Sequence, residues 1–107
     1  MNIQTAYASG KLTICLAGEL DHHAARETMR SVMELVDEYM PRECVLDLNG
    51  LRFMDSSGVG LMVRLTRRIK ELNGRLWIEN PGSQVRRVLE CAGVDRLVQV
   101  TAIGGRT

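Results

Sequence analysis

The sequence contains very few aromatic residues and almost no net charge. Only one Trp, two Tyr and one Phe occur among 107 residues, and the formal net charge is +1. Nucleic-acid-binding domains combine a marked excess of positive charge with rings that stack on bases. The two basic clusters, at 64–70 and 86–87, fall on predicted helices with an apolar opposite face, which is typical of solvated helix faces. We therefore expect no direct contact with nucleic acid.

Cysteine is scarce as well, and long apolar runs are missing. Cys15, Cys44 and Cys91 are odd in number and widely spaced, so they give neither a disulfide framework nor a metal-ligand pair. We interpret all three as small buried residues in a reducing compartment. No window approaches the roughly 18 apolar residues of a membrane span, and residues 1–9 lack the apolar run of a signal peptide. A cytoplasmic protein without membrane contact is expected.

The motifs of common enzymes are missing too. There is no Gly-Lys-Ser or Gly-Lys-Thr phosphate loop and no G-x-G-x-x-G after the first strand that leads into a helix. A hydrolase with Ser56 as nucleophile and His22 or His23 as base is disfavoured, because a nucleophile elbow needs glycine two places before the serine, where Met54 stands. Adjacent histidines also make a poor metal pair. We expect no enzyme activity, no cofactor and no metal, with a small nucleotide-binding domain as an alternative.

What is present is a regular alternation of strands and helices. Apolar patterning predicts strands at 3–8, 12–17, 44–48, 75–79 and 97–100, the third ended by Asn49-Gly50. Helical spacing predicts helices that begin at Asp21, near Ser56 and at a Ser83 cap, and that end at Pro41, Asn73 and Gly93. The alternation predicts a single α/β domain, 1–107 with a loose tail at 104–107. Its sheet is mixed and mostly parallel, with an N-terminal antiparallel hairpin and three or four helices.

Two loops at the carboxyl ends of predicted strands carry carboxylates and hydroxyls. One spans 19–23 and the other spans 55–60, and each leads directly into a helix N-terminus. Loops at the carboxyl ends of parallel strands gather at one edge of a sheet and commonly form the functional site. Asp21 and Asp55 are therefore expected to flank Ser56 at that edge.

The composition of the second loop favours contact with a partner protein. A plain helix cap would account for one serine, but Ser56 is followed by Ser57, Gly58 and Gly60. Each glycine weakens the first helical turn by about 1 kcal/mol relative to alanine. Each also removes a side chain, so that another backbone can approach closely. Such a surface suits docking.

Two segments resemble the signatures of a known family. Phe53-Met54-Asp55-Ser56-Ser57-Gly58-Val59-Gly60 resembles the signature of the anti-sigma factor antagonists, the STAS domain family. Gly18-Glu19-Leu20-Asp21-His22-His23 is similar to the signature of the branch that acts on the anti-sigma F factor in sporulation. The spacing of the two motifs also matches, and the likeness covers nearly the whole chain.

The resemblance implies a monomeric partner-switching module. The unphosphorylated protein would bind an anti-sigma factor that is also a serine kinase, and would thereby release the sigma factor. Phosphorylation of Ser56 would switch binding off, and a metal-dependent serine phosphatase would reverse it. The same likeness leaves open a STAS module of a general stress pathway. The partner-binding residues it implies are Asp21, Asp55, Ser56, Ser57, Gly58 and Gly60.

Overall fold

Five strands form one mixed sheet in the computed structural model, which describes residues 1–101; the predicted tail at 104–107 lies outside them. The spatial order follows the chain, with β1 (Asn2–Ala8) antiparallel to β2 (Lys11–Leu20) and all later pairs parallel. The other strands are β3 (Glu43–Met54), β4 (Arg75–Glu79) and β5 (Gln99–Thr101). The predicted α/β class, with its antiparallel hairpin and mostly parallel sheet, is confirmed.

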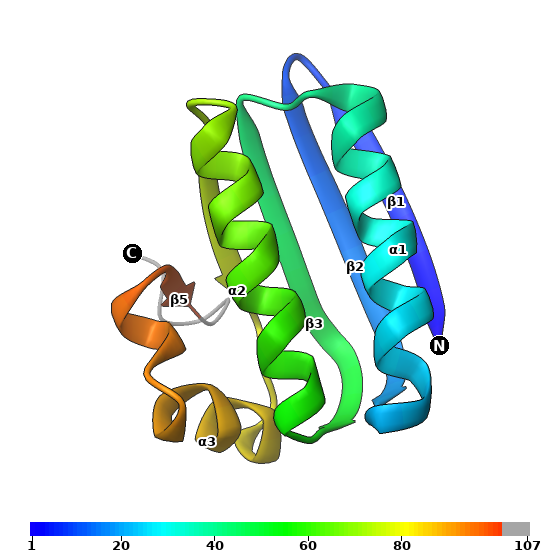
Figure 1. Cartoon of the computed structure of the whole chain (residues 1–107), viewed down its shortest axis with the longest axis vertical. Coiled ribbons are helices and arrows are strands. Elements are labelled where there is room, and N and C mark those ends of the chain that lie inside the picture. Colours follow the sequence, from blue (N-terminus) through cyan, green and yellow to red (C-terminus); the bar gives the residue numbers. More distant parts are fainter. Residues whose placement is uncertain (102–107) are drawn as a thin grey trace.

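The helices make the crossovers between the parallel strands. They are α1 (His22–Tyr39), α2 (Ser56–Glu71) and α3 (Ser83–Cys91), followed by a 3₁₀ turn over Val94–Arg96. Figure 1 shows α1 and α2 side by side across one face of the sheet, with their N-terminal ends at the same edge. That edge is the one at which β2 and β3 end.

The core lies between this sheet face and the two long helices. Along β2, Leu12, Ile14 and Leu16 are fully buried, whereas Thr13 and Cys15 between them are only partly covered. This alternation follows from the two-residue period of a strand. Buried residues of α1 and α2 complete the core, among them Val32, Val36, Leu61, Leu65 and Ile69.

The prediction that Asn49-Gly50 ends the third strand was wrong. β3 continues to Met54 through a bulge, since Cys15 pairs with Asp47 but Ala17 pairs with Gly50. The Asn49 N–H donates to Asp47 Oδ1 at 2.9 Å, and Asn49 has no partner residue in β2. A Cβ on Gly50 would lie 2.9 Å from the Ala17 Cβ, so glycine allows pairing to resume there. The extension carries the chain to the edge where α2 begins.

Two smaller corrections concern the C-terminal third of the chain. Ser83 does not cap α3: the cap position is Gly82, no side chain bonds there, and Ser83 is the first helical residue. The last strand starts at Gln99, because Leu97 closes the 3₁₀ turn and is 50% exposed. The sequence pattern merged this turn with the strand.

The three cysteines differ in environment, contrary to the prediction that all are buried. Cys44 is fully buried, Cys15 is partly covered and Cys91 is exposed. The inward face of α3 carries Val85 and Leu89, and a residue two places after Leu89 points roughly to the opposite side of a helix. Burial raises the pKa of the Cys44 thiol to about 12.

We expect iodoacetamide to alkylate Cys91 and to spare Cys44 in the folded protein at about pH 8. The Cys44 thiol is both inaccessible and protonated at that pH, whereas Cys91 faces solvent. Peptide mass spectrometry after labelling measures this directly, with urea-unfolded protein as the control in which all three thiols react. Comparable labelling of Cys44 and Cys91 before unfolding would contradict the placement of Cys44 in the core.

Candidate functional site

The site forms where β2 and β3 end side by side. Leu20 pairs with Met54 at the ends of the two strands, and the Asp55 N–H donates to the Leu20 carbonyl at 3.3 Å. Asp21 and Asp55 are the next residues, and each is the N-cap of the helix that follows. The structure therefore brings the two predicted loops together at one edge.

The Asp55 carboxylate joins the starts of both long helices. Its Oδ1 accepts a hydrogen bond from the Ser57 N–H at 2.8 Å, which caps α2, and its Oδ2 accepts from the His22 N–H of α1 at 3.1 Å. Asp21 caps α1 by accepting from the Ala24 N–H at 3.0 Å. Each carboxylate satisfies backbone donors that a helix N-terminus otherwise leaves unpaired. The relative position of the two loops is thus fixed by hydrogen bonds.

Ser56 is exposed at the first position of α2. The cap belongs to Asp55, so the Ser56 hydroxyl is not needed to start the helix. Among residues 1–101, no hydrogen bond engages that hydroxyl, whereas the neighbouring Ser57 is half-buried with its N–H bound to Asp55. Ser56 is the more accessible of the two serines.

The two glycines of the motif have different surroundings. Gly58 is buried, and a Cβ there would overlap with Met54 Cγ and lie 2.6 Å from Met54 Sδ and 3.0 Å from Leu20 Cδ2. Gly60 is exposed, and a Cβ there would meet nothing within 4 Å. Gly58 therefore lets α2 pack onto the strand ends, while Gly60 leaves an open surface one turn from Ser56.

Sequence reasoning missed Gln84, which holds the end of β3 in place. Its side-chain Nε2 donates to the Met54 carbonyl at 2.9 Å, and its Oε1 accepts from the Met54 N–H at 3.0 Å. The amide thus pairs with one backbone unit as a neighbouring strand would. Met54 is fully buried and precedes Asp55. No local pattern signals a contact that spans 30 residues, although a polar residue in the first turn of α3 is a hint.

Replacing Gln84 with alanine is expected to destabilise the fold by about 2 kcal/mol, because both Met54 backbone groups lose their partner. The loss should be largest at the site edge, so amide exchange at Asp55 and Ser56 should accelerate. Thermal melting and hydrogen exchange measure the two effects. The control is Ser83→Ala, which removes an exposed hydroxyl from the same helix turn and should leave exchange at the site unchanged. Unaltered exchange at the site in Gln84→Ala would show that this amide does not hold the loop.

Two adjacent histidines follow Asp21 at the start of α1. His22 and His23 are exposed, with ring centroids 5.8 Å apart in an edge-on arrangement. Within residues 1–101, no group of three or more His, Cys, Asp or Glu side chains could hold a metal ion. Over the same range no helix has the length and apolar character needed to cross a bilayer.

The chain belongs to the STAS domain family, whose model matches residues 2–103. A curated relative, the anti-sigma F factor antagonist of Lysinibacillus sphaericus, is 35% identical over 83 residues, which cover 78% of this chain and 71% of the relative. The family expected from the two motifs is therefore confirmed.

Two solved structures share both the fold and part of the sequence. The anti-sigma factor antagonist SpoIIAA in its unphosphorylated form matches with a TM-score of 0.78 and 29% identity, covering 92% of this chain and 87% of that one. The Bacillus cell fate determinant SpoIIAA in its phosphorylated form matches with a TM-score of 0.70 and 28% identity, covering 92% and 90%. One of these relatives thus carries phosphate.

Proposed function

We propose that this protein is an anti-sigma factor antagonist that is switched by phosphorylation of Ser56. The unphosphorylated form binds an anti-sigma factor that is also a serine kinase, and the sigma factor is released. The kinase transfers phosphate from ATP to Ser56 and binding ends, until a metal-dependent serine phosphatase removes the phosphate. The protein itself has no catalytic role.

The observation that carries the proposal is the position of Ser56. It is exposed at the first residue of α2, and its hydroxyl is not needed to cap the helix because Asp55 is the N-cap. A kinase can reach such a hydroxyl without unfolding the domain. A helix N-terminus also tolerates added negative charge, so the fold survives modification.

The charges around Ser56 explain how phosphate would end docking. Phosphate adds about −1.5 to −2 charges at pH 7. The Asp21 and Asp55 carboxylates already accept hydrogen bonds from the two helix starts, so the edge would carry a concentrated negative field. An interface formed around a neutral serine would then contain an unpaired dianion, which is costly to desolvate. Phosphorylation would therefore abolish binding without unfolding the domain.

The sporulation branch is the pathway we favour. The match to the anti-sigma F factor antagonist of Lysinibacillus sphaericus supports it, together with the Gly18–His23 segment. A general stress pathway would use the same chemistry with a different kinase. The distinction therefore rests on which kinase the protein binds.

The proposal is tested by titrating the purified unphosphorylated protein into a complex of sigma factor F and its anti-sigma factor. Release of free sigma factor, followed by size-exclusion chromatography, is the expected result, with a stable complex of antagonist and anti-sigma factor. The same titration against the anti-sigma factor of a stress pathway is the specificity control. Sigma factor that stays bound in both titrations would contradict the proposal.

A further inference from the structure

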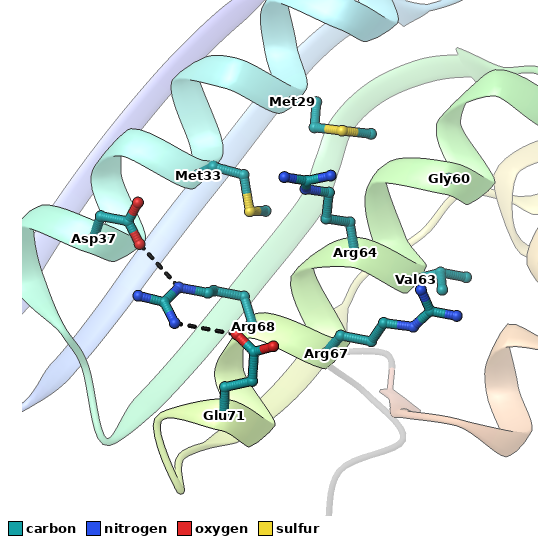
Figure 2. A pocket seen from close by; sticks show the side chains of 9 residues that line it. All are labelled: Met29, Met33, Asp37, Gly60, Val63, Arg64, Arg67, Arg68 and Glu71. Atoms are coloured by element: carbon teal, nitrogen blue, oxygen red, sulfur yellow. Dashed lines mark hydrogen bonds and ion pairs between the residues drawn. The ribbon is translucent and has the colours of Figure 1, made fainter.

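A groove of about 680 Å³ lies between α1 and α2, one turn from Ser56. Its walls combine thioether and aliphatic groups with guanidinium groups: Met29 and Met33 come from α1, and Val63, Arg64 and Arg67 come from α2. Gly60 forms the end nearer to Ser56. Figure 2 shows Arg64 directed toward Met29 across the space between the two helices.

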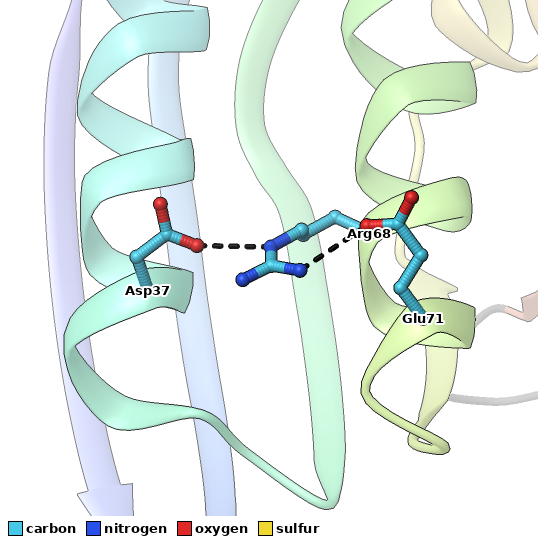
Figure 3. A network of polar contacts seen from close by, with 3 residues as sticks. All are labelled: Asp37, Arg68 and Glu71. Atoms are coloured by element: carbon cyan, nitrogen blue, oxygen red, sulfur yellow. Dashed lines mark hydrogen bonds and ion pairs between the residues drawn. The ribbon is translucent and has the colours of Figure 1, made fainter.

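The other end of the groove is closed by an ion-pair network. Arg68 Nε donates to Asp37 Oδ1 at 2.9 Å across the two helices, and Arg68 Nη1 donates to Glu71 Oε1 at 3.1 Å (Figure 3). The Arg68 side chain is only 33% exposed. Because Arg68 already pairs with Asp37 and Glu71, its guanidinium is not available to a partner protein at this end of the groove.

Arg64 and Arg67 differ from Arg68 because they have no partner. Within residues 1–101, neither forms an ion pair or a side-chain hydrogen bond, and both are exposed. The sequence predicted a solvated basic helix face here. Both side chains are exposed, as that prediction requires. Figure 2 shows the Arg64 guanidinium beside Met29, whereas the Arg67 side chain is directed along α2 toward Val63. The partly buried Met29 and Met33 side chains can adapt their shape to an incoming side chain.

The groove and Ser56 share one face of α2. Counted from Ser56, the residues Gly60, Val63, Arg64 and Arg67 stand at steps of 4, 7, 8 and 11, which is the spacing of a single helix stripe. From Gly60 to Glu71 the stripe extends roughly 17 Å at 1.5 Å per residue. A protein that docks on Ser56 and follows α2 therefore enters the groove, and about three turns of a helix fit along it.

We propose that this groove binds an acidic amphipathic helix of the anti-sigma partner, an inference that rests on the function proposed above. An apolar side chain of that helix inserts between Met29, Met33 and Val63, while its carboxylates pair with Arg64 and Arg67. Docking thus has two parts. Phosphorylation of Ser56 abolishes the contact at the sheet edge, whereas the charge attraction in the groove is the same before and after phosphorylation.

Titration calorimetry of the double variant Arg64→Glu/Arg67→Glu against the purified anti-sigma factor tests the assignment. Reversal of both charges should weaken binding at least ~10-fold at low salt, and the affinity of the variant should no longer fall as salt rises from about 0.05 to 0.5 M. The matched control is Lys70→Glu, which reverses one charge on the same helix outside the groove and should change affinity less than about 2-fold. Circular dichroism checks that every variant is folded.

The arms of the experiment separate this inference from the proposed function. If the wild type fails to bind, both fall. If the wild type binds and Ser56→Asp does not, but the double arginine variant binds as tightly as the wild type, the groove assignment is overturned and the switch stands. If sedimentation shows instead that the wild type dimerises through Arg64 and Arg67, a second copy is the occupant and the assignment is wrong.

A photo-crosslinking residue at Val63 gives an independent readout. It should crosslink to an acidic helix of the anti-sigma factor, identified by peptide mass spectrometry. The same label at Glu34, an exposed residue of α1 that does not line the groove, is the control and should give no crosslink. A Val63 crosslink to a basic or neutral region of the partner would overturn the assignment.

Discussion

Replacing Ser56 with aspartate is expected to weaken binding to the anti-sigma factor by roughly 100-fold, since an interface formed around a neutral serine would have to desolvate an unpaired carboxylate. The added carboxylate joins Asp21 and Asp55 at one edge of the sheet, where both existing carboxylates are already engaged by helix N–H groups. Isothermal titration calorimetry against the purified partner measures the loss. Circular dichroism should show an unchanged fold, because acidic residues suit the first turn of a helix.

Two variants control for shape and for net charge. Ser56→Ala should bind well, because a small neutral side chain keeps the interface uncharged, and it should retain the helix start because Asp55 is the cap. Ser9→Asp adds the same charge in the turn between β1 and β2 and should bind like the wild type, since an aspartate tolerates its φ of 52°. Wild-type affinity in folded Ser56→Asp would mean that charge at this position does not block docking.

Alanine at Gly58 and at Gly60 should have opposite effects on stability. Gly58→Ala is expected to cost about 1–3 kcal/mol through overpacking, because its Cβ would overlap with the buried Met54 side chain and press on Leu20. Gly60→Ala is expected to stabilise the fold by about 1 kcal/mol, because nothing lies within 4 Å of its Cβ. Urea denaturation of the two variants gives both values on the same helix turn.

A larger side chain at Gly60 then separates folding from docking. Gly60→Leu should fold as stably as the wild type, because nothing lies within 4 Å of a Cβ there and the added atoms project into the open groove, but it should bind the partner weakly. A collapse of stability in Gly60→Leu would mean that the glycine is structural. Equal stability of Gly58→Ala and Gly60→Ala would contradict the packing described at the start of α2.

The sequence was a good guide to the order of elements because strong local signals marked their ends. Asp21 and Asp55 could be placed as helix starts, and parallel strands could be expected to bring them together. The bulge at Asn49-Gly50 was missed because this dipeptide usually marks a turn. Gly50 is needed because Ala17 of β2 lies so close to it. The sequence of β3 alone gives no sign of this contact with a neighbouring strand.

Sequence patterns predicted the site residues that belong to local motifs, but not the contacts between distant segments. The motif carried Ser56 and both carboxylates, but not the burial of Gly58, since the contact with Met54 depends on how α2 meets the sheet. The Gln84 amide acts across the chain and has no spacing signature. Arg64 and Arg67 are exposed, as the sequence predicted, but no spacing signal shows that Met29 and Met33 of α1 line the same groove.

The most direct measurement of the central claim uses protein phosphorylated to completion by the anti-sigma kinase with ATP. Mass spectrometry should locate the phosphate on Ser56, and calorimetry should detect no binding of the modified protein to the kinase while its melting temperature stays near that of the unmodified form. Treatment with the serine phosphatase should restore full affinity. Phosphate on Ser57 would keep the mechanism and move the residue, whereas undiminished binding by the phosphorylated protein would contradict the account.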